Sequence, residues 1–88
     1  MKTEFLNHFY KDLKAIKNEN IRIDIFNSIK QVELAESIKE IKNIKKLKGS
    51  KIAYRIRIGD YRIGLYIENN IIEFARISHR KDIYNLFP

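Results

Sequence analysis

Apolar and polar side chains alternate strictly on both sides of the dipeptide Gly59-Asp60, and no other feature restricts the fold of this chain as strongly. Successive side chains of a β-strand point to opposite faces, and a two-residue turn that contains glycine is typical of a tight hairpin. Such a turn also fixes the register of the two strands. The predicted cross-strand pairs are Ile58 with Tyr61, Arg57 with Arg62, and Arg55 with Gly64. One face of the hairpin is therefore apolar, and the other carries the arginines.

A second turn, at Asn69-Asn70, predicts a third antiparallel strand. Counting from this turn places Ile72 and Phe74 on the apolar face of the sheet. The side chains expected on the arginine face are Ala75, Ile77 and His79. The same count directs Arg76 toward the core, so we expect a β-bulge or a position at the rim of the sheet there.

The first half of the chain has helical spacing instead. Phe9, Leu13 and Ile16 form one apolar stripe, which predicts a helix over roughly residues 7–17. A second stripe predicts another helix after Asn18-Glu19-Asn20. Its members are Ile21, Ile25, Ile29 and Val32. We expect the two helices to form an antiparallel hairpin that packs against the sheet.

Two segments are less decisive. Apolar residues spaced by three from Ile38 to Leu47 predict a short helix or a turn that leads into the sheet and ends at Gly49. Residues 3–6 are either the start of the first helix or a short edge strand. With one proline and three glycines, the chain has no segment that resembles a linker. We therefore predict a single α+β domain over residues 1–88, in which an N-terminal helical hairpin packs on a small, twisted antiparallel sheet.

Composition narrows the range of functions. The absence of cysteine excludes disulfides, thiolate metal sites and a cysteine nucleophile. The N-terminal residues lack the apolar run of a signal peptide, and no later run approaches the length of a membrane span, so we expect a cytoplasmic protein without a membrane partner. Lys and Arg number 18 against 11 Asp and Glu, which gives a net charge of +7. This charge suits a polyanionic partner such as RNA, DNA or a ribosome, although a generally basic composition without a specific partner gives the same number.

The arginine face is the best candidate for a functional site. Arginines that face each other across two strands repel each other, unless an anion lies between them. Guanidinium groups bind phosphate oxygens in a two-point manner, so Arg55, Arg57 and Arg62 are interpreted as a phosphate-binding cradle, with Gly64 keeping its floor open. An exposed charged face that only maintains solubility is the alternative, and the convergence of three strands on one face favours the cradle. His79, expected beside Arg62, is a candidate for proton transfer.

Other residues near this face have two interpretations each. Tyr84 is either a residue of a C-terminal apolar cluster or a ring on which a nucleobase stacks. A lysine-rich segment before the hairpin is either a solvated run or a set of contacts to a nucleic-acid backbone. Its lysines are Lys42, Lys45, Lys46, Lys48 and Lys51.

Three motifs of this sequence together resemble the RelE/ParE superfamily of toxins from type II toxin–antitoxin systems. They are Leu47-Lys48-Gly49, the strand and turn from Tyr54 to Arg62, and the segment His79-Arg80-Lys81-Asp82-Ile83-Tyr84, and the helical hairpin with Lys-Asp-Leu at 11–13 also fits. The resemblance covers nearly the whole chain. It implies a ribosome-dependent mRNA endoribonuclease that inhibits translation and is held inactive by a cognate antitoxin protein. It further implies cleavage without a metal or a small-molecule cofactor, in which the 2′-OH attacks the adjacent phosphate and leaves 2′,3′-cyclic phosphate and 5′-OH ends.

The resemblance also suggests roles for individual residues. Some RelE relatives carry lysines on the second strand, one of them proposed as general base, where this chain has Arg55 and Arg57. Because a guanidinium stays protonated, neither arginine can be that base. The hypothesis assigns proton transfer to His79, transition-state stabilisation to Arg57 and Arg62, and stacking or orientation of a base to Tyr84. Phosphate binding is assigned to Arg55, Arg80, Lys48 and Lys51. The alternatives are a ParE-like inhibitor of DNA gyrase and a non-catalytic module that binds RNA or an antitoxin.

Overall fold

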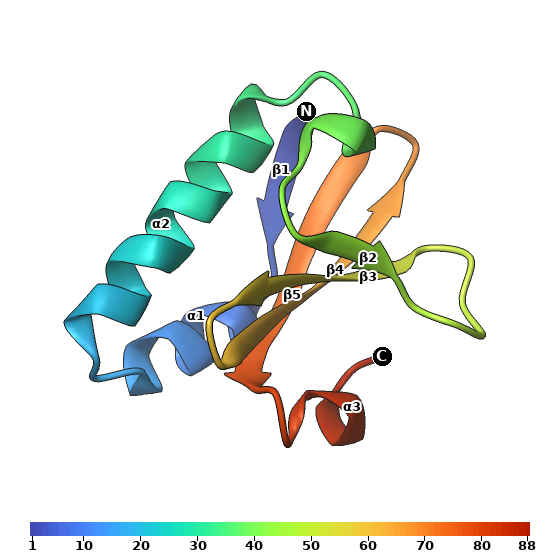
Figure 1. Ribbon diagram of the computed structural model, residues 1–88. Coiled ribbons are helices and arrows are strands. Elements are labelled where there is room, and N and C mark those ends of the chain that lie inside the picture. Colours follow the sequence, from blue (N-terminus) through green and yellow to red (C-terminus); the bar gives the residue numbers. More distant parts are fainter.

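The computed structural model describes all 88 residues and has the predicted α+β architecture (Figure 1). Its elements are β1 (Lys2–Phe5), α1 (Asn7–Ala15), α2 (Glu19–Leu34), the 3-10 helix η1 (Ile38–Glu40), β2 (Ile44–Lys46), β3 (Ala53–Ile58), β4 (Tyr61–Glu68), β5 (Ile71–His79) and α3 (Ile83–Leu86). None of the helices combines the length and the apolar composition that crossing a membrane requires.

The five strands form one sheet in the order β1-β5-β4-β3-β2. β1 pairs in parallel with β5, and every other neighbouring pair is antiparallel. The N-terminal residues thus form an edge strand, which was one of the two interpretations of this segment. The prediction of a helix or turn from Ile38 to Leu47 is right only for η1, because residues 44–46 form β2. Ile44 lies opposite Ile56 of β3, and such a pairing with a distant partner leaves no trace in local spacing.

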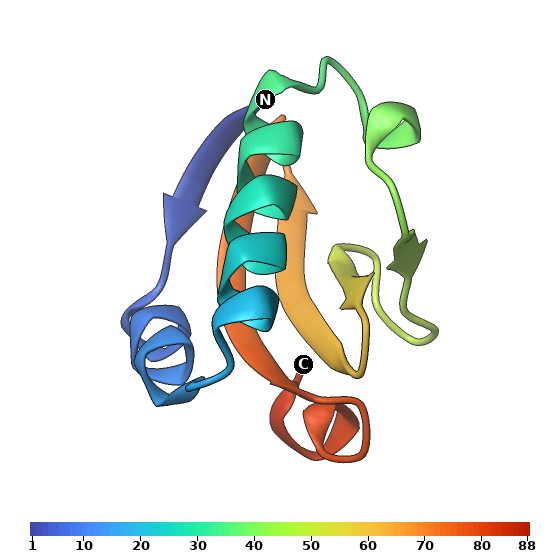
Figure 2. The same cartoon turned by 60° about the vertical axis from the view of Figure 1, so that its left-hand side comes forward.

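Both predicted helical stripes are buried. Phe9 and Leu13 of α1 and Ile25, Ile29 and Val32 of α2 contribute to one apolar core with the strands. Asn18 caps α2, since its side-chain oxygen accepts a hydrogen bond from the backbone N–H of Ile21 at 3.1 Å. Figure 2 shows α2 running along the sheet while α1 is seen nearly end-on. The two helices follow each other as expected, but they are not antiparallel. Instead, α1 lies across the N-terminal end of α2 and packs mainly against β5.

The two faces of the sheet are covered differently. The apolar face packs under α2 and holds most of the buried side chains, among them Ile56, Ile63 and Phe74. On the opposite face, the short α3 packs on a second, smaller apolar cluster. Its buried members are Ala53, Ala75, Ile83 and Phe87. The rest of this second face has no helix over it and carries the arginines.

A β-bulge interrupts the pairing of β4 with β5. Gly64 lies opposite Arg76 and Leu65 lies opposite Phe74, so Ala75 is the extra residue in β5. The sequence predicts an irregularity at Arg76, and the structure places it at the adjacent residue. A single extra residue reverses the facing of every side chain that follows it in the strand. The bulge therefore decides which residues at the end of β5 can reach the arginine face.

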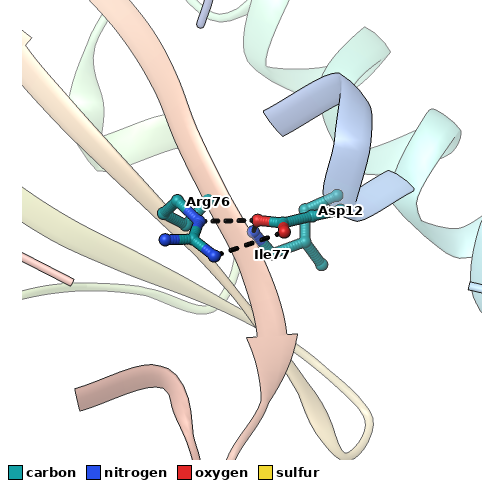
Figure 3. A network of polar contacts seen from close by, with 3 residues as sticks. All are labelled: Asp12, Arg76 and Ile77. Atoms are coloured by element: carbon teal, nitrogen blue, oxygen red, sulfur yellow. Dashed lines mark hydrogen bonds and ion pairs between the residues drawn. The ribbon is translucent and has the colours of Figure 1, made fainter. Parts of the chain in front are cut away.

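Asp12 of α1 binds both the side chain of Arg76 and the backbone of β5 just after this bulge (Figure 3). Arg76 Nε donates to Asp12 Oδ2 at 2.8 Å, and the backbone N–H of Ile77 donates to the same oxygen at 2.9 Å. Both charged side chains are largely shielded, with 21% and 17% of their surface exposed. The carboxylate thus satisfies a strand N–H that lies beyond the end of β1 and neutralises Arg76.

Replacing Asp12 with alanine is expected to lower the free energy of unfolding by about 2 kcal/mol, because it leaves a shielded guanidinium and a strand N–H without a partner. Asp12→Asn should lose only about half as much, since its amide oxygen can still accept from Ile77. Urea unfolding of the two variants measures the difference. Equal losses would show that the hydrogen bond to Ile77, which asparagine can keep and alanine cannot, does not contribute to stability.

Candidate functional site

The arginine pair predicted from the hairpin is present. Arg57 of β3 lies directly opposite Arg62 of β4, and Arg55 lies opposite Gly64. Directly opposite side chains in an antiparallel pair have Cβ atoms roughly 5 Å apart. The two positive charges are therefore neighbours, and no acidic side chain of β3 or β4 lies between them. Three strand positions thus bring three guanidinium groups onto one face.

Arg62 is at the centre of this cluster. Its pKa is lowered by partial burial and by the positive charges of Arg55, Arg57 and Arg80, while Tyr84 acts in the opposite direction. Its Nη1 atom donates to the carbonyl oxygens of Gly59 at 2.8 Å and Tyr61 at 2.9 Å, so the backbone of the hairpin turn holds the guanidinium in place. A partly desolvated cation among like charges favours the binding of an anion.

The segment after β5 brings Arg80 to the β3–β4 turn. The backbone N–H of Arg80 donates to the carbonyl oxygen of Asp60 at 2.7 Å, and Arg80 Nε lies 3.7 Å from Asp60 Oδ1. Both side chains of this ion pair are well exposed, so it is weak and can exchange for another anion. The structure therefore places Arg80 beside the strand arginines, as the sequence predicts.

A groove of about 330 Å³ lies between the β2–β3 segment and the C-terminal residues. It is lined by Lys45, Lys46, Leu47, Lys48, Tyr84, Phe87 and Pro88. Tyr84 is 61% exposed, so its side chain is available for contact with a ligand. Lys48 lines the groove, whereas the exposed Lys51 does not.

No group of three or more His, Asp or Glu side chains lies close enough together to hold a metal ion.

The prediction that His79 shares the arginine face is wrong. Because of the bulge, Ser78 lies opposite Arg62, and His79 lies opposite Tyr61 on the side of the sheet that α2 covers. The imidazole makes an edge contact with the Tyr61 ring, with centroids 5.8 Å apart, and His79 Nδ1 accepts from the backbone N–H of Lys81 at 3.2 Å. Ile77 is likewise buried in the core, opposite Ile63, instead of facing the arginines. Proton transfer by His79 thus stays a prediction that its position does not support.

The expected open floor at Gly64 is also wrong. The Phe87 ring covers this glycine so closely that a Cβ atom there would lie 2.6 Å from ring carbons of Phe87. The same ring contacts Tyr66, with centroids 4.9 Å apart. Gly64 therefore provides the close approach that anchors the C-terminal segment, and this anchor holds α3 and Tyr84 beside the arginines.

Comparison with known proteins assigns the family. No family model matches the chain. Toxin RelE3 of Methanocaldococcus jannaschii is 43% identical over 89 residues, an alignment that covers 100% of both chains. The chain belongs to the RelE toxin family. Putative toxin RelE1 of the same organism is 35% identical over 82 residues, which cover 84% of this chain and 83% of the relative.

Solved RelE structures share the fold. The RelB–RelE antitoxin–toxin complex of Methanococcus jannaschii superimposes with a TM-score of 0.81 at 41% identity, over 97% of this chain and 99% of that chain. The RelE–RelB complex of Pyrococcus horikoshii gives a TM-score of 0.73 at 19% identity, over 93% of this chain and 97% of that chain. The three-layer arrangement of α2, sheet and α3 is therefore that of RelE toxins.

In this RelE family member, the structure adds to the arginine cluster one residue that the sequence pattern does not single out. Lys45 of β2 lies directly opposite Arg55, so its side chain shares the arginine face. The sequence marks Lys45 only as one of five lysines in a charged run, because three residues of strand are too few for alternation to be recognised. The helix or turn predicted there gave no reason to pair Lys45 with Arg55.

Because the facing arginines repel each other, Arg57→Gln is expected to raise the free energy of unfolding by about 0.5 kcal/mol at low ionic strength. The corresponding rise in the melting temperature is about 2–4 °C for a domain of this size. The gain should disappear in about 1 M salt, where charges are screened over a few ångströms. Lys30→Gln on the exposed side of α2 is the matched control, and a similar gain from both variants would contradict the specific repulsion.

Proposed function

We propose that this protein is the toxin of a toxin–antitoxin pair and that it cleaves mRNA bound to the ribosome, which would place its action in the cytoplasm. In the proposed reaction, the 2′-oxygen of one nucleotide attacks the adjacent phosphorus and the 5′-oxygen of the next nucleotide leaves. The products carry a 2′,3′-cyclic phosphate and a 5′-OH. No metal or small-molecule cofactor takes part in this proposal, because the cations that the phosphate requires are side chains of the protein.

The main support for this proposal is that Arg57 and Arg62 lie directly opposite each other on the arginine face. The attacked phosphorus gains negative charge on its oxygens, and preorganised cations stabilise that charge. Arg62 is fixed by two carbonyl oxygens, so little reorganisation is needed when the charge develops. We assign transition-state stabilisation to this pair and the binding of flanking phosphates to Arg55 and Arg80.

The C-terminal segment contributes recognition of the nucleotide. The exposed ring of Tyr84 borders the groove next to the arginines, and nucleobases stack on such rings. Lys48 lines the same groove, and we assign it an electrostatic contact with the RNA backbone. Lys51 follows in the same loop, and we assign it a weaker electrostatic contribution because it lies outside the groove.

An antitoxin partner is part of the proposal. The solved relatives from Methanococcus jannaschii and Pyrococcus horikoshii are complexes of RelE with RelB. Two features of this chain support a similar partner. The arginine face is open and strongly positive, and α2 exposes the large apolar side chains Ile23, Phe26 and Leu34 to solvent. An antitoxin that covers both surfaces would neutralise the site and bury these side chains.

The proposal is tested by incubating the purified chain with translating ribosomes and, separately, with DNA gyrase. We expect mRNA cleavage, with the ends identified by their reactivity toward polynucleotide kinase. Lys30→Gln serves as a control that removes one exposed charge remote from the site. Inhibited supercoiling with intact mRNA would favour the ParE-like alternative, and no effect on either target would favour a non-catalytic binding module.

A further inference from the structure

The proposed cleavage needs a group that accepts the proton of the attacking 2′-hydroxyl, and the arginine cluster contains none. A guanidinium does not give up its proton in proteins, and His79 lies on the side of the sheet that α2 covers. The groups on the arginine face that can change protonation state are therefore lysine amines and tyrosine hydroxyls. We propose that Lys45 of β2 is the proton acceptor. This inference rests on the proposed function and adds to it a residue that the sequence motifs do not mark.

The position of Lys45 follows from the pairing of β2 with β3. Lys45 lies opposite Arg55, which in turn lies opposite Gly64 under the Phe87 ring, so these three positions form one row across β2, β3 and β4. Arg57 and Arg62 form the adjacent row on the same face. Phosphate oxygens held by these arginines would lie within reach of the four-carbon side chain of Lys45.

The groove provides independent support for this orientation. Lys45 and Tyr84 line the same groove, although they come from β2 and α3. A base stacked on Tyr84 would carry its ribose and the following phosphate past Lys45. The charged and titratable groups that face Lys45 are Arg55 on β3, Lys46 and Lys48 along its own segment, and Tyr84 from α3. Pro88 also lines this groove, but the only ion pairs of the structure join Arg76 to Asp12 and Arg80 to Asp60, so no carboxylate holds the Lys45 amine in a fixed position.

Lys48, which lines the same groove, is less well positioned. Lys48 lies in the loop after β2, next to Gly49 with its φ of +82°, and has no strand partner. β2, in contrast, is fixed at both ends. The backbone N–H of Arg57 donates to Asn43 at 3.2 Å, and that of Leu47 donates to Ala53 at 2.9 Å. A group that transfers a proton needs the more rigid support.

The proposed step is balanced in atoms and electrons. The neutral amine of Lys45 takes the 2′-hydroxyl proton while the 2′-oxygen forms a bond to phosphorus. The bond from phosphorus to the 5′-oxygen breaks, its electron pair goes to that oxygen, and the oxygen takes a proton from solvent water. The resulting Lys45 ammonium returns its proton to solvent before the next turnover.

The test compares Lys45→Arg with Lys42→Arg in single-turnover cleavage of ribosome-bound mRNA between about pH 7 and about pH 9. Both substitutions keep the positive charge, so RNA affinity should be unchanged in both. Lys42 follows η1 and lines a different pocket, between α2 and β3, and so serves as a matched control. We expect the wild-type rate to rise with pH, since only the neutral amine accepts a proton. Lys45→Arg should lose this rise and about 100-fold of the rate, whereas Lys42→Arg should keep both.

A chemical rescue distinguishes proton transfer from a structural role. Because the chain contains no cysteine, Lys45→Cys carries a single thiol, which 2-bromoethylamine converts to a lysine analogue. Treatment before addition of ribosomes should restore cleavage together with its rise with pH. An unchanged pH profile in Lys45→Arg, or loss of the rise in Lys48→Arg instead, would overturn the role of Lys45 while leaving the proposed cleavage intact. Failure of the unmodified protein to cleave would overturn both.

Discussion

Arg62→Ala is expected to reduce the rate of ribosome-dependent mRNA cleavage about 1,000-fold, because it removes the central cation of the cluster. The loss of one preorganised group that stabilises developing charge typically costs 10²–10³ in rate. Arg62 should lie near the upper end, since it is partly buried and held by two carbonyl oxygens of the hairpin turn. Single-turnover cleavage of a defined mRNA at saturating protein measures the effect.

A second variant separates the charge of Arg62 from its geometry. Arg62→Lys keeps the positive charge but loses the planar fork that binds two phosphate oxygens, so we expect a rate between those of the wild type and the alanine variant. Lys30→Ala, in the exposed part of α2, controls for the loss of one charge. Circular dichroism checks that all variants are folded. Wild-type cleavage by a folded Arg62→Ala would remove this residue from the mechanism.

Gly64→Ala should lower the free energy of unfolding by about 2 kcal/mol, although alanine normally fits a strand better than glycine. The reason is the Phe87 ring, which would lie 2.6 Å from the added Cβ atom. The ring must move, and the short α3 that carries Tyr84 moves with it. We therefore expect cleavage to fall together with stability, and urea unfolding combined with the cleavage assay tests both effects.

A double-mutant cycle isolates this contact. Phe87→Leu on its own should destabilise the protein, because it removes part of a buried ring from the smaller apolar cluster. Combined with Gly64→Ala, the smaller side chain leaves room for the new methyl group, so the two losses should be less than additive. Strict additivity would contradict the proposed close approach of Phe87 to Gly64.

The hairpin of β3 and β4 could be predicted residue by residue because its register depends on a short turn and on local alternation. The pairs of Arg57 with Arg62 and Arg55 with Gly64 are both confirmed. His79 could not be placed in the same way, since one extra residue at Ala75 reverses the count that follows it. The approximate position of the bulge was recognisable from the charge of Arg76. Its effect on the end of the strand depends on the pairing partner in β4.

Two other features depend on contacts between segments distant in the sequence. Lys45 joins the site through the pairing of β2 with β3, and β2 is too short to be recognised on its own. Phe87 reaches Gly64 from the C-terminal segment, and nothing in the local pattern of either residue indicates the contact. The sequence was sufficient for the arginine cluster itself, and it missed the groups that the rest of the fold adds around it.

The order of strands in the sheet has a consequence for how the protein is made. β1 comprises residues 2–5 but pairs only with β5, residues 71–79, so an early segment joins the sheet only after a segment about 70 residues later has been synthesised. Pairings of such long sequence separation form late, since closing the intervening loop costs entropy before any contact forms. A chain that ends before residue 71 would lack both β5 and Tyr84. We expect β1 to stay unpaired in such a fragment, because β5 is the strand that it pairs with.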